Sequence, residues 1–498
     1  MFPKLLIANR GEIAVRLIRA CRELDIRTVA VFSDADRAAL HVRLADEAYR
    51  IGPAPAAESY LRIDTLLAVA QQSGATAVHP GYGFLSENAD FAAACEAAGL
   101  AFIGPPSRAI RALGSKTAGR QLAASIGVPV VPGGRADTDE AAHHAAAQLG
   151  FPLIVKAVAG GGGKGMRVVE RPADLASALR TARAEGQKAF GNPAVYLEHQ
   201  LPVPRHIEVQ ILADLHGTVY ALGDRDCSVQ RRHQKVLEEA TAPFLDPALR
   251  DRLHDAAVRL AQAAGYVNAG TMEFLVTADG QYYFLEANPR LQVEHPVTEL
   301  VTGCDLVQLQ LRIAAGERLT LTPDDLTPRG AALECRIYAE DPFQTFAPGP
   351  GTITGLREPG GPGVRVDSGI YEGWTVPAAY DPLIAKVSTW GRDRAQALQR
   401  MRRALREHHV QGIPTTIAFH RQILEEPTFT AGAVDTTYLA RRFPDRPHAW
   451  DETERAIAVI AAAVHARRLQ SSSPLIAPAG PGLSPWVLAG RQAALRCG

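Results

Sequence analysis

The sequence lacks the features of a disulfide-rich, zinc-binding or membrane protein. Its six cysteines, at positions 21, 95, 227, 304, 335 and 497, form no CxxC pair and no regular spacing, which argues against a disulfide framework and a zinc site. No apolar stretch reaches the length of a membrane-spanning helix, and charged residues soon follow the short apolar run in MFPKLLIANRGE. We therefore expect a cytoplasmic protein without a membrane partner.

The sequence also has no excess of positive or negative charge. Lys plus Arg and Asp plus Glu number 53 each, so no overall field recruits nucleic acid. The hydrophobic fraction of 47% and the charged fraction of 21% are ordinary for a folded globular protein. Because 498 residues exceed the size of one compact core, we expect three or four domains.

Two glycine motifs of nucleotide-binding proteins are absent. The turn at 9–11 does not match GxGxxG, and KAVAGGGGKGMRVV does not match GxxxxGK[ST]. The N-terminal pattern nevertheless predicts a strand at 5–8, an amphipathic helix over 11–24 and a strand at 28–33. Further strands near 77–78 and 102–103 predict an open, mostly parallel α/β domain, which does not by itself imply NAD.

The composition changes again beyond residue 114. An Ala-rich helical segment leads to the strands PLIVKAV and MRVV, which flank the glycine run and indicate a small separate lobe. Apolar and polar residues alternate near 206–300, as they do in β-strands. A mixed segment after about 331 ends in helices near 392–409 and 415–426. A helix around 452–469 precedes SSSPLIAPAGPG, which is typical of a flexible linker.

The segment GTMEFLVTADGQYYFLEANPR allows a geometric prediction. Two β-rich runs flank Asp279-Gly280, which indicates a two-residue hairpin loop. Counting outward places Glu273 opposite Glu286, and alternation puts Asn288 on the same face. Opposed carboxylates are destabilising unless a cation lies between them, and oxygen ligands of this kind suit Mg²⁺ or Mn²⁺. The alternative is a hairpin face that is simply solvated.

The glycine run offers a second candidate site. Lys156 ends a strand just before Gly160, Gly161, Gly162 and Gly163, and glycines let backbone amides crowd around an anion. A flexible linker is the alternative, but the flanking strands and Lys156 favour phosphate binding.

Polar and charged runs supply two further candidates. RHIEVQILAD has a polar face, which could be solvated, and leads into the charge-rich GDRDCSVQRRHQKVLEEA, a surface loop unless a phosphoryl group lies near it. In ANPRLQVEHPVTE, Arg290, Gln292 and Glu294 alternate directly after Asn288. A cation, an amide and a carboxylate in this order could orient a small anion and deprotonate it; a structural ion pair is the alternative.

Six strings together resemble the biotin carboxylase family in order and spacing: IANRGEIAVR, HPGYGFLSEN, KAVAGGGGKGMR, RDCSVQRRHQK, EANPRLQVEHPVTE and ECRIYAEDP. The resemblance covers about residues 3–445. It implies an α/β fold, α+β in parts: a Rossmann-like domain at 1–113, an ATP-grasp domain at 114–330 with a glycine-rich lid at about 131–204, a mixed domain at 331–445, and a tail at 446–498.

The resemblance also implies residue roles. ATP would contact Lys116, Lys156, the glycines 160–163, His206, Gln230 and His233, with Glu198 and Leu201 at the adenine edge. Two Mg²⁺ or Mn²⁺ ions would bind Glu273, Glu286 and Asn288. Bicarbonate would bind Lys235, Arg290, Gln292 and Val293. Glu294 would be the general base, Arg336 would stabilise the biotin enolate, and Tyr82 would lie near the biotin ring.

Three positions depart from the pattern that the family suggests. They are Ala287 where Met is common, His199 where Lys is frequent and Lys164 where Arg often occurs. None removes a ligand that the resemblance implies, but His199 leaves the contact at the adenine edge open.

Partners follow from what the resemblance implies and from what the chain lacks. No Met-Lys-Met hairpin, the mark of a biotin carrier, surrounds any of the four methionines. We therefore expect a ligase subunit that carboxylates biotin on a separate biotin carboxyl carrier protein, works with carboxyltransferase subunits and forms a homodimer. The acceptor beyond biotin stays open between acetyl-CoA, another acyl-CoA and pyruvate. The segment 446–498 is either a partner-docking element or a surface helix.

Two other functions compete with this one. A different ATP-grasp ligase would share the metal and nucleotide residues, but RLQVEHP and Arg336 argue against it. A non-catalytic ATP-binding protein would be expected to lack the metal ligands or the base, and all are present.

Overall fold

The computed structural model describes residues 1–136, 138–158, 166–444 and 452–471. It is mixed α/β, as the sequence predicts, and separates into two compact units, Met1–Asp445 and Arg446–Gly498. Among the described residues, no helix is both long and apolar enough to cross a membrane.

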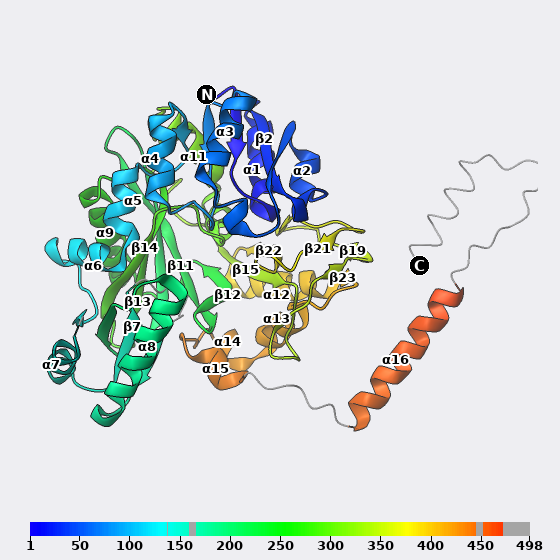
Figure 1. The fold of residues 1–498 in the computed structure, drawn as a ribbon. Helices are drawn as coiled ribbons and strands as arrows, with labels where there is room; N and C mark the ends of the chain where they lie inside the picture. The colour runs from blue at the N-terminus through cyan, green and yellow to red at the C-terminus, as the bar shows by residue number, and fades with distance from the viewer. Residues whose placement is uncertain (137, 159–165, 445–451, 472–498) are drawn as a thin grey trace, which may run out of the picture. The chain divides into compact units, whose positions relative to one another are not determined.

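A five-stranded parallel sheet of order β3-β2-β1-β4-β5 forms the N-terminal part of the first unit (Figure 1). Helix α1 covers it with Ile13, Leu17 and Cys21, which are all buried, so the predicted parallel α/β start is confirmed. The strands are β1 (Lys4–Ile7), β2 (Arg27–Ser33), β3 (Glu47–Gly52), β4 (Ala77–His79) and β5 (Ala101–Phe102); the helices are α1 (Gly11–Glu23), α2 (Leu40–Leu44), α3 (Ile63–Ser73), α4 (Ala89–Ala97) and α5 (Ser107–Gly114).

A four-stranded antiparallel sheet forms the small lobe, in the order β6-β9-β7-β8. Alternation along β7 buries Leu153 and Val155 against α8 and leaves Ile154 and Lys156 on the other face. The strands are β6 (Gly133–Arg135), β7 (Leu153–Ala157), β8 (Met166–Val169) and β9 (Val195–His199); the helices are α7 (Asp139–Leu149) and α8 (Leu175–Phe190).

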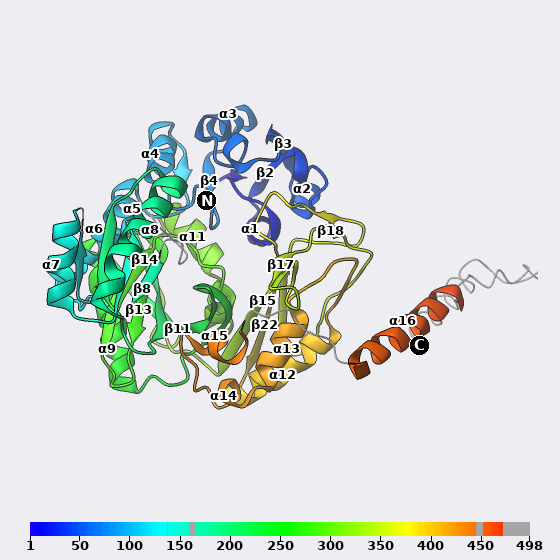
Figure 2. The ribbon, with the colours of Figure 1, turned by 60° about the horizontal axis from the view of Figure 1, so that its bottom comes forward.

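The largest sheet has eight antiparallel strands, in the order β14-β13-β10-β11-β12-β15-β22-β20. Strand β12 pairs with β15, so segments from before and after residue 330 share one sheet. Helix α9 packs on β10 and β11, as Figure 2 shows. The strands are β10 (Arg205–Ala213), β11 (Val219–Arg231), β12 (Gln234–Ala240), β13 (Asn268–Val276), β14 (Tyr282–Asn288), β15 (Ala331–Tyr338), β20 (Val364–Ser368) and β22 (Leu383–Gly391).

The remaining elements flank these sheets or follow them. Helix α12 packs on β22 and β15, which buries Leu398, Met401 and Leu405. The other helices of the first unit are α6 (Lys116–Ser125), α9 (Pro247–Ala263), α10 (His295–Thr302), α11 (Leu306–Ala314), α12 (Arg394–Glu407), α13 (Ile417–Glu425), α14 (Pro427–Thr430) and α15 (Tyr438–Arg442). Three short ribbons pair β16 (Glu340–Asp341) with β17 (Ala347–Pro348), β18 (Gly351–Thr352) with β21 (Thr375–Val376), and β19 (Gly355–Arg357) with β23 (His409–Gln411). The second unit holds α16 (Glu452–Ser471).

The loop of the hairpin between β13 and β14 differs from the prediction. The Thr277 amide donates to the Gln281 carbonyl at 2.9 Å, so the loop has three residues, 278–280, and the predicted two-residue loop was wrong. Gly280 ends it with φ +77°, the left-handed conformation typical of three-residue hairpin loops.

A β-bulge then restores the predicted register. Phe274 opposes Phe284 and Glu273 opposes Glu286, which leaves Leu285 as an extra residue in β14. The longer loop and the bulge each shift the register by one residue, and the two shifts cancel. The predicted pairing of Glu273 with Glu286 is confirmed, although one step in its derivation was wrong.

Candidate active site

A cavity of about 990 Å³ lies within the first unit, lined by the small lobe and by one face of the large sheet. Most of the residues predicted for the site gather around it. Those that line it are Lys156, Glu198, Leu201, His206, Gln230, His233, Lys235, Glu273, Glu286, Asn288, Arg290, Gln292, Val293 and Arg336, together with His199 and Ala287, two of the positions that depart from the family pattern.

The other predicted residues lie elsewhere. Glu294 is fully buried behind the lining, and Tyr82 is half-buried on the loop after β4. Lys116 is the first residue of α6, where the Ser115 hydroxyl caps the helix by accepting from the Ala118 amide at 3.0 Å; its side chain is outside the described part. Residues 160–164, with the glycines and Lys164, also lie outside the described residues.

Lys235 on β12 is the centre of the charged cluster. Its ammonium donates to Glu208 at 2.5 Å, to Glu273 at 2.7 Å and to Glu294 at 2.7 Å, which uses all three of its donors. Burial disfavours the ammonium ion, but the three carboxylates outweigh burial and hold the pKa of Lys235 well above its ordinary value. A fixed positive charge therefore lies among the carboxylates.

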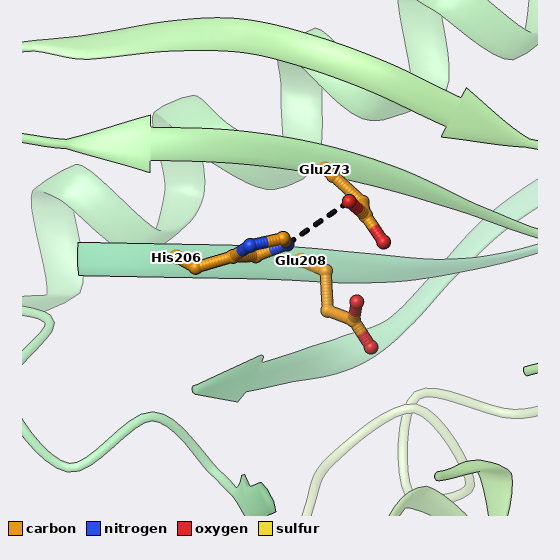
Figure 3. A group of neighbouring side chains, drawn as sticks. All are labelled: His206, Glu208 and Glu273. Atoms are coloured by element: carbon orange, nitrogen blue, oxygen red, sulfur yellow. Dashed lines mark ion pairs between the residues drawn. The ribbon is translucent and has the colours of Figure 1, made fainter. Parts of the chain in front are cut away.

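Glu273 on β13 lies opposite Glu208 on β10, and the side chain of His206, two residues before Glu208, reaches Glu273 (Figure 3). The His206 Nε2 atom lies 3.0 Å from Glu273 Oε2, and the Asn288 amide donates to Glu273 Oε1 at 2.8 Å. Burial opposes ionisation, yet Lys235 and His206 lower the pKa of Glu273. Burial likewise disfavours the imidazolium, but the charge of Glu273 raises the pKa of His206. The charges of Lys235 and His206 therefore favour the ionised form of Glu273.

Arg336 on β15 bridges two buried carboxylates. Its Nε donates to Glu238 at 2.6 Å and its Nη2 donates to Glu294 at 2.9 Å. Burial opposes the charge on Glu294, but Lys235, Arg336 and Arg225 together hold the pKa of Glu294 well below its ordinary value. Glu294 therefore carries a full negative charge directly behind two cations of the cavity wall.

The Arg290 guanidinium organises the segment after β14. It contacts Glu87 at 3.1 Å through Nε, Gln292 at 2.9 Å through Nη1 and Asn288 at 3.0 Å through Nη2. The predicted alternation thus brings Arg290 and Gln292 together, whereas the carboxylate of Glu294 turns to Lys235 and Arg336.

The residues predicted for ATP form two smaller groups. Glu198 pairs with Lys156 and accepts from Arg120 at 2.7 Å. The Gln230 side-chain amide nitrogen donates to His206 Nδ1 at 2.8 Å. His233 lies in the turn between β11 and β12 with φ +65°.

Three buried residues that support the site had no role in the sequence prediction: Glu208, Arg225 and Glu238. Arg225 is fully buried; it pairs with Glu208 and donates to Gln210 at 2.8 Å and Thr298 at 2.8 Å. Of the two alternatives for its charge run, the surface loop was wrong, because residues 223–231 lie in β11 and residues 234–240 lie in β12. The polar face of RHIEVQILAD was the available signal, because it supplies Glu208 and Gln210.

Replacing Arg225 by methionine should strongly destabilise the protein. The change leaves Glu208 with one fewer cation in a dry interior, which typically costs about 3–5 kcal/mol. Urea unfolding followed by tryptophan fluorescence measures the loss. The control is Arg62→Met, which breaks a pair with Asp64 whose side chains are 51% and 66% exposed and should cost under about 1 kcal/mol. Equal losses in both variants would contradict this account of Arg225.

Replacing Glu238 by glutamine should change how stability depends on pH. Burial raises the pKa of Glu238 to about 8 despite Arg336, so folding takes up a proton between the ordinary value and pH 8, and wild-type stability falls as pH rises through that window. Glutamine does not titrate. The melting temperature of Glu238→Gln relative to wild type should therefore increase from pH 5 to pH 8.5; a constant difference would show that Glu238 is ionised throughout.

Family models of known proteins match most of the chain. The chain matches the carbamoyl-phosphate synthase L chain ATP-binding domain over residues 115–322, the biotin carboxylase N-terminal domain over 1–110 and the biotin carboxylase C-terminal domain over 334–441. It is 53% identical over 440 residues to a biotin carboxylase of Nostoc sp., which covers 88% of this chain and 98% of that protein. The chain belongs to the biotin carboxylase family.

Two further relatives belong to a pyruvate carboxylase and to a 2-oxoglutarate carboxylase. A pyruvate carboxylase subunit of Methanothermobacter thermautotrophicus is 52% identical over 442 residues, or 88% of this chain and 90% of that protein. The biotin carboxylase domain of a Hydrogenobacter thermophilus 2-oxoglutarate carboxylase, solved as a dimer with MgADP, ADP and bicarbonate, has a TM-score of 0.86 at 44% identity, covering 89% and 98% of the two chains. The predicted family and fold class are confirmed, and the chain is an ATP-dependent carboxylase, a ligase.

Proposed function

We propose that this biotin carboxylase family member uses MgATP and bicarbonate to carboxylate biotin on a separate biotin carboxyl carrier protein. The observation that carries the proposal is the position of Lys235, whose ammonium lies 2.7 Å from Glu273 and 2.7 Å from Glu294. One cation thereby joins the paired carboxylates of the hairpin to the buried acid beside Arg336. Transfer of a phosphoryl group to a small anion brings negative charges together, so a positive charge is needed between the two groups.

ATP and bicarbonate fit different parts of the cavity. ATP lies against the small lobe and strands β10 and β11, under a lid formed by about residues 131–204. Bicarbonate lies against Lys235 and the segment after β14. The ATP contacts are Lys116, Lys156, Gly160–Gly163, Glu198, Leu201, His206, Gln230 and His233; the bicarbonate contacts are Lys235, Arg290, Gln292 and Val293.

The donor set of the hairpin fits Mg²⁺ or Mn²⁺. Glu273, Glu286 and Asn288 bring carboxylate and amide oxygens to one wall of the cavity, and hard divalent ions prefer oxygen. Two such ions would supply positive charge that offsets the negative charge of the nucleotide phosphates. The Hydrogenobacter neighbour was solved with MgADP, which supports this assignment.

The chemistry then follows from where the charges lie. Glu294 removes the bicarbonate proton, and the bicarbonate oxygen attacks the γ-phosphorus of ATP, releasing ADP and forming carboxyphosphate. Carboxyphosphate breaks into CO₂ and phosphate, and phosphate takes the ureido proton of biotin. Arg336 stabilises the resulting enolate, with Tyr82 near the ring, while the nitrogen attacks CO₂. A closed lid keeps water from the intermediate.

The low pKa of Glu294 is compatible with its role as a base. Its low value depends on Lys235 and Arg336 as the principal cations. When bicarbonate and biotin share these two cations, less positive charge remains for Glu294, and its pKa rises toward the range in which a general base is effective.

The final acceptor is an acyl-CoA, such as acetyl-CoA, selected by a carboxyltransferase on another chain, and the active form is a homodimer. The second candidate is the biotin carboxylase subunit of a two-subunit pyruvate carboxylase, because the Methanothermobacter relative is 52% identical. Purifying the tagged chain from its native cell decides between them: co-purified transferase subunits should carboxylate acetyl-CoA or propionyl-CoA, and carboxylation of pyruvate alone would favour the second candidate.

The wild-type protein should show an ATPase that requires bicarbonate and is stimulated by free biotin, measured by ADP release. Glu294→Ala and Arg336→Ala should retain ATP binding, measured by calorimetry, and lose biotin-dependent turnover by about 100-fold or more. An ATPase activity that does not depend on bicarbonate would overturn the proposed function. Normal carboxylation in either variant would overturn only that residue's role.

Glu286→Gln should raise the Mg²⁺ concentration needed for half-maximal ATPase by about tenfold, because an amide replaces a charged ligand. Removing Mg²⁺ with EDTA should abolish activity in both proteins, and Mn²⁺ should restore it. The matched control is Glu58→Gln, an exposed glutamate of the N-terminal part; an unchanged Mg²⁺ requirement in Glu286→Gln would contradict the metal assignment.

A further inference from the structure

A second buried lysine, Lys386 on β22, lies behind the candidate active site and has no part in the chemistry above. It is 0% exposed, and its ammonium donates to the main-chain carbonyl of Val293 at 2.8 Å. A charged donor to a carbonyl is among the stronger hydrogen bonds. The bond therefore fixes the peptide that joins Val293 to Glu294.

The anchor for Lys386 comes from a distant part of the chain. Its ammonium lies 3.3 Å from Glu12 on α1 and 3.8 Å from Asp367 on β20. Glu12 is 4% exposed, and the described residues offer its two carboxylate oxygens no hydrogen bond beyond this ion pair. A buried carboxylate with one cation beside it is costly unless that cation stays in place, so Glu12 restrains Lys386.

The charge balance keeps Lys386 a cation. The charged groups around it are Glu12 on α1, Glu334 on β15, and Asp367 and Arg365 on β20. Burial disfavours the ammonium, but the three acids outweigh burial and raise the pKa of Lys386. Arg365 is occupied with Asp367 at 2.8 Å and with Glu299 at 2.6 Å, so it does not replace Lys386 beside Val293.

Lys386 also faces the other substrate region. Its ammonium lies 5.8 Å from the ring centroid of Tyr82, within the range of a cation–π contact. Tyr82 is on the loop after β4, and its carbonyl accepts from Asn9 at 2.8 Å, just before α1. One side chain thus contacts the segment proposed for bicarbonate, the loop proposed for biotin and the helix that precedes both in the sequence.

We propose that Lys386 is a positioning residue that fixes Val293 and Glu294 relative to α1 and the Tyr82 loop, so that bicarbonate is held in reach of the base. This inference rests on the proposed function. Lys386 touches no substrate; it acts through the Val293 carbonyl. A displacement of about 1 Å at such a segment typically costs up to about 100-fold in rate.

The decisive variant is the double change Glu12→Gln with Lys386→Met. It replaces both partners of the buried pair of Glu12 and Lys386, and replacing both partners of a buried pair is often neutral for stability. The bond to Val293 is nevertheless lost. Stability and positioning are thereby separated, even if Lys386→Met alone fails to fold.

The measurements are the KM for bicarbonate, the KM for ATP and the thermal midpoint of the full chain. Lys386→Met should lower the thermal midpoint and raise the KM for bicarbonate about tenfold or more, with the KM for ATP within about twofold. The double variant should recover the midpoint but not the KM for bicarbonate. The control Lys4→Met, which removes a lysine paired with Glu47 at 2.8 Å, should leave both KM values unchanged.

The outcomes separate this inference from the proposed function. A double variant with a wild-type KM for bicarbonate means that Lys386 serves only charge balance, which overturns the positioning role while the proposed function stands. A wild-type protein whose ATPase needs neither bicarbonate nor biotin overturns both. Recovery of stability without recovery of bicarbonate affinity supports the inference.

Discussion

The ammonium of Lys235 is the interaction on which the rest of the site depends. It lies within 2.7 Å of carboxylates from β10, β13 and the start of α10. Without it, Glu208, Glu273 and Glu294 would repel one another in a dry interior, and at least one would have to take up a proton. Because the cation is fixed, all three acids can face one point, and the large sheet can keep a charged face toward the cavity.

Behind the ammonium of Lys235, further buried cations pair with carboxylates and carbonyl groups and balance the charge. Arg225 neutralises Glu208, Arg336 links Glu294 to Glu238, and Lys386 holds the Val293 carbonyl from the side of α1. Each cation reaches the site from a different strand. The eight-stranded sheet matters because β12 pairs with β15, which places Lys235 and Arg336 on adjacent strands although about 100 residues separate them in the sequence.

The sequence predicts the features that depend on local patterns of apolar and polar residues. It does not predict those that depend on contacts between distant parts of the chain. The parallel start follows from short apolar strands on either side of an amphipathic helix, and the small lobe follows from the strands that flank the glycine run. The pair of Glu273 with Glu286 follows from counting outward along the hairpin, where the longer loop and the bulge cancel. The bulge at Leu285 does not follow from a local pattern, because it arises where the Phe284 amide donates to Pro129 at 2.7 Å, outside the hairpin. The sequence also did not predict the burial of Arg225. Its partners come from β10 and α10, and a run of charged residues by itself indicates a solvent-exposed segment.

The arrangement also implies that cation and anion binding in the proposed reaction support each other. Without ligands, Lys235 is held by Glu208, Glu273 and Glu294. A divalent cation bound to Glu273 would compete with Lys235 for that carboxylate, and the ammonium of Lys235 would then be available to an anion. An anion bound to Lys235 would in turn leave Glu273 available to the metal. Linkage requires this coupling to be reciprocal, so a site built from mutually satisfied ions favours binding all substrates over binding any one alone.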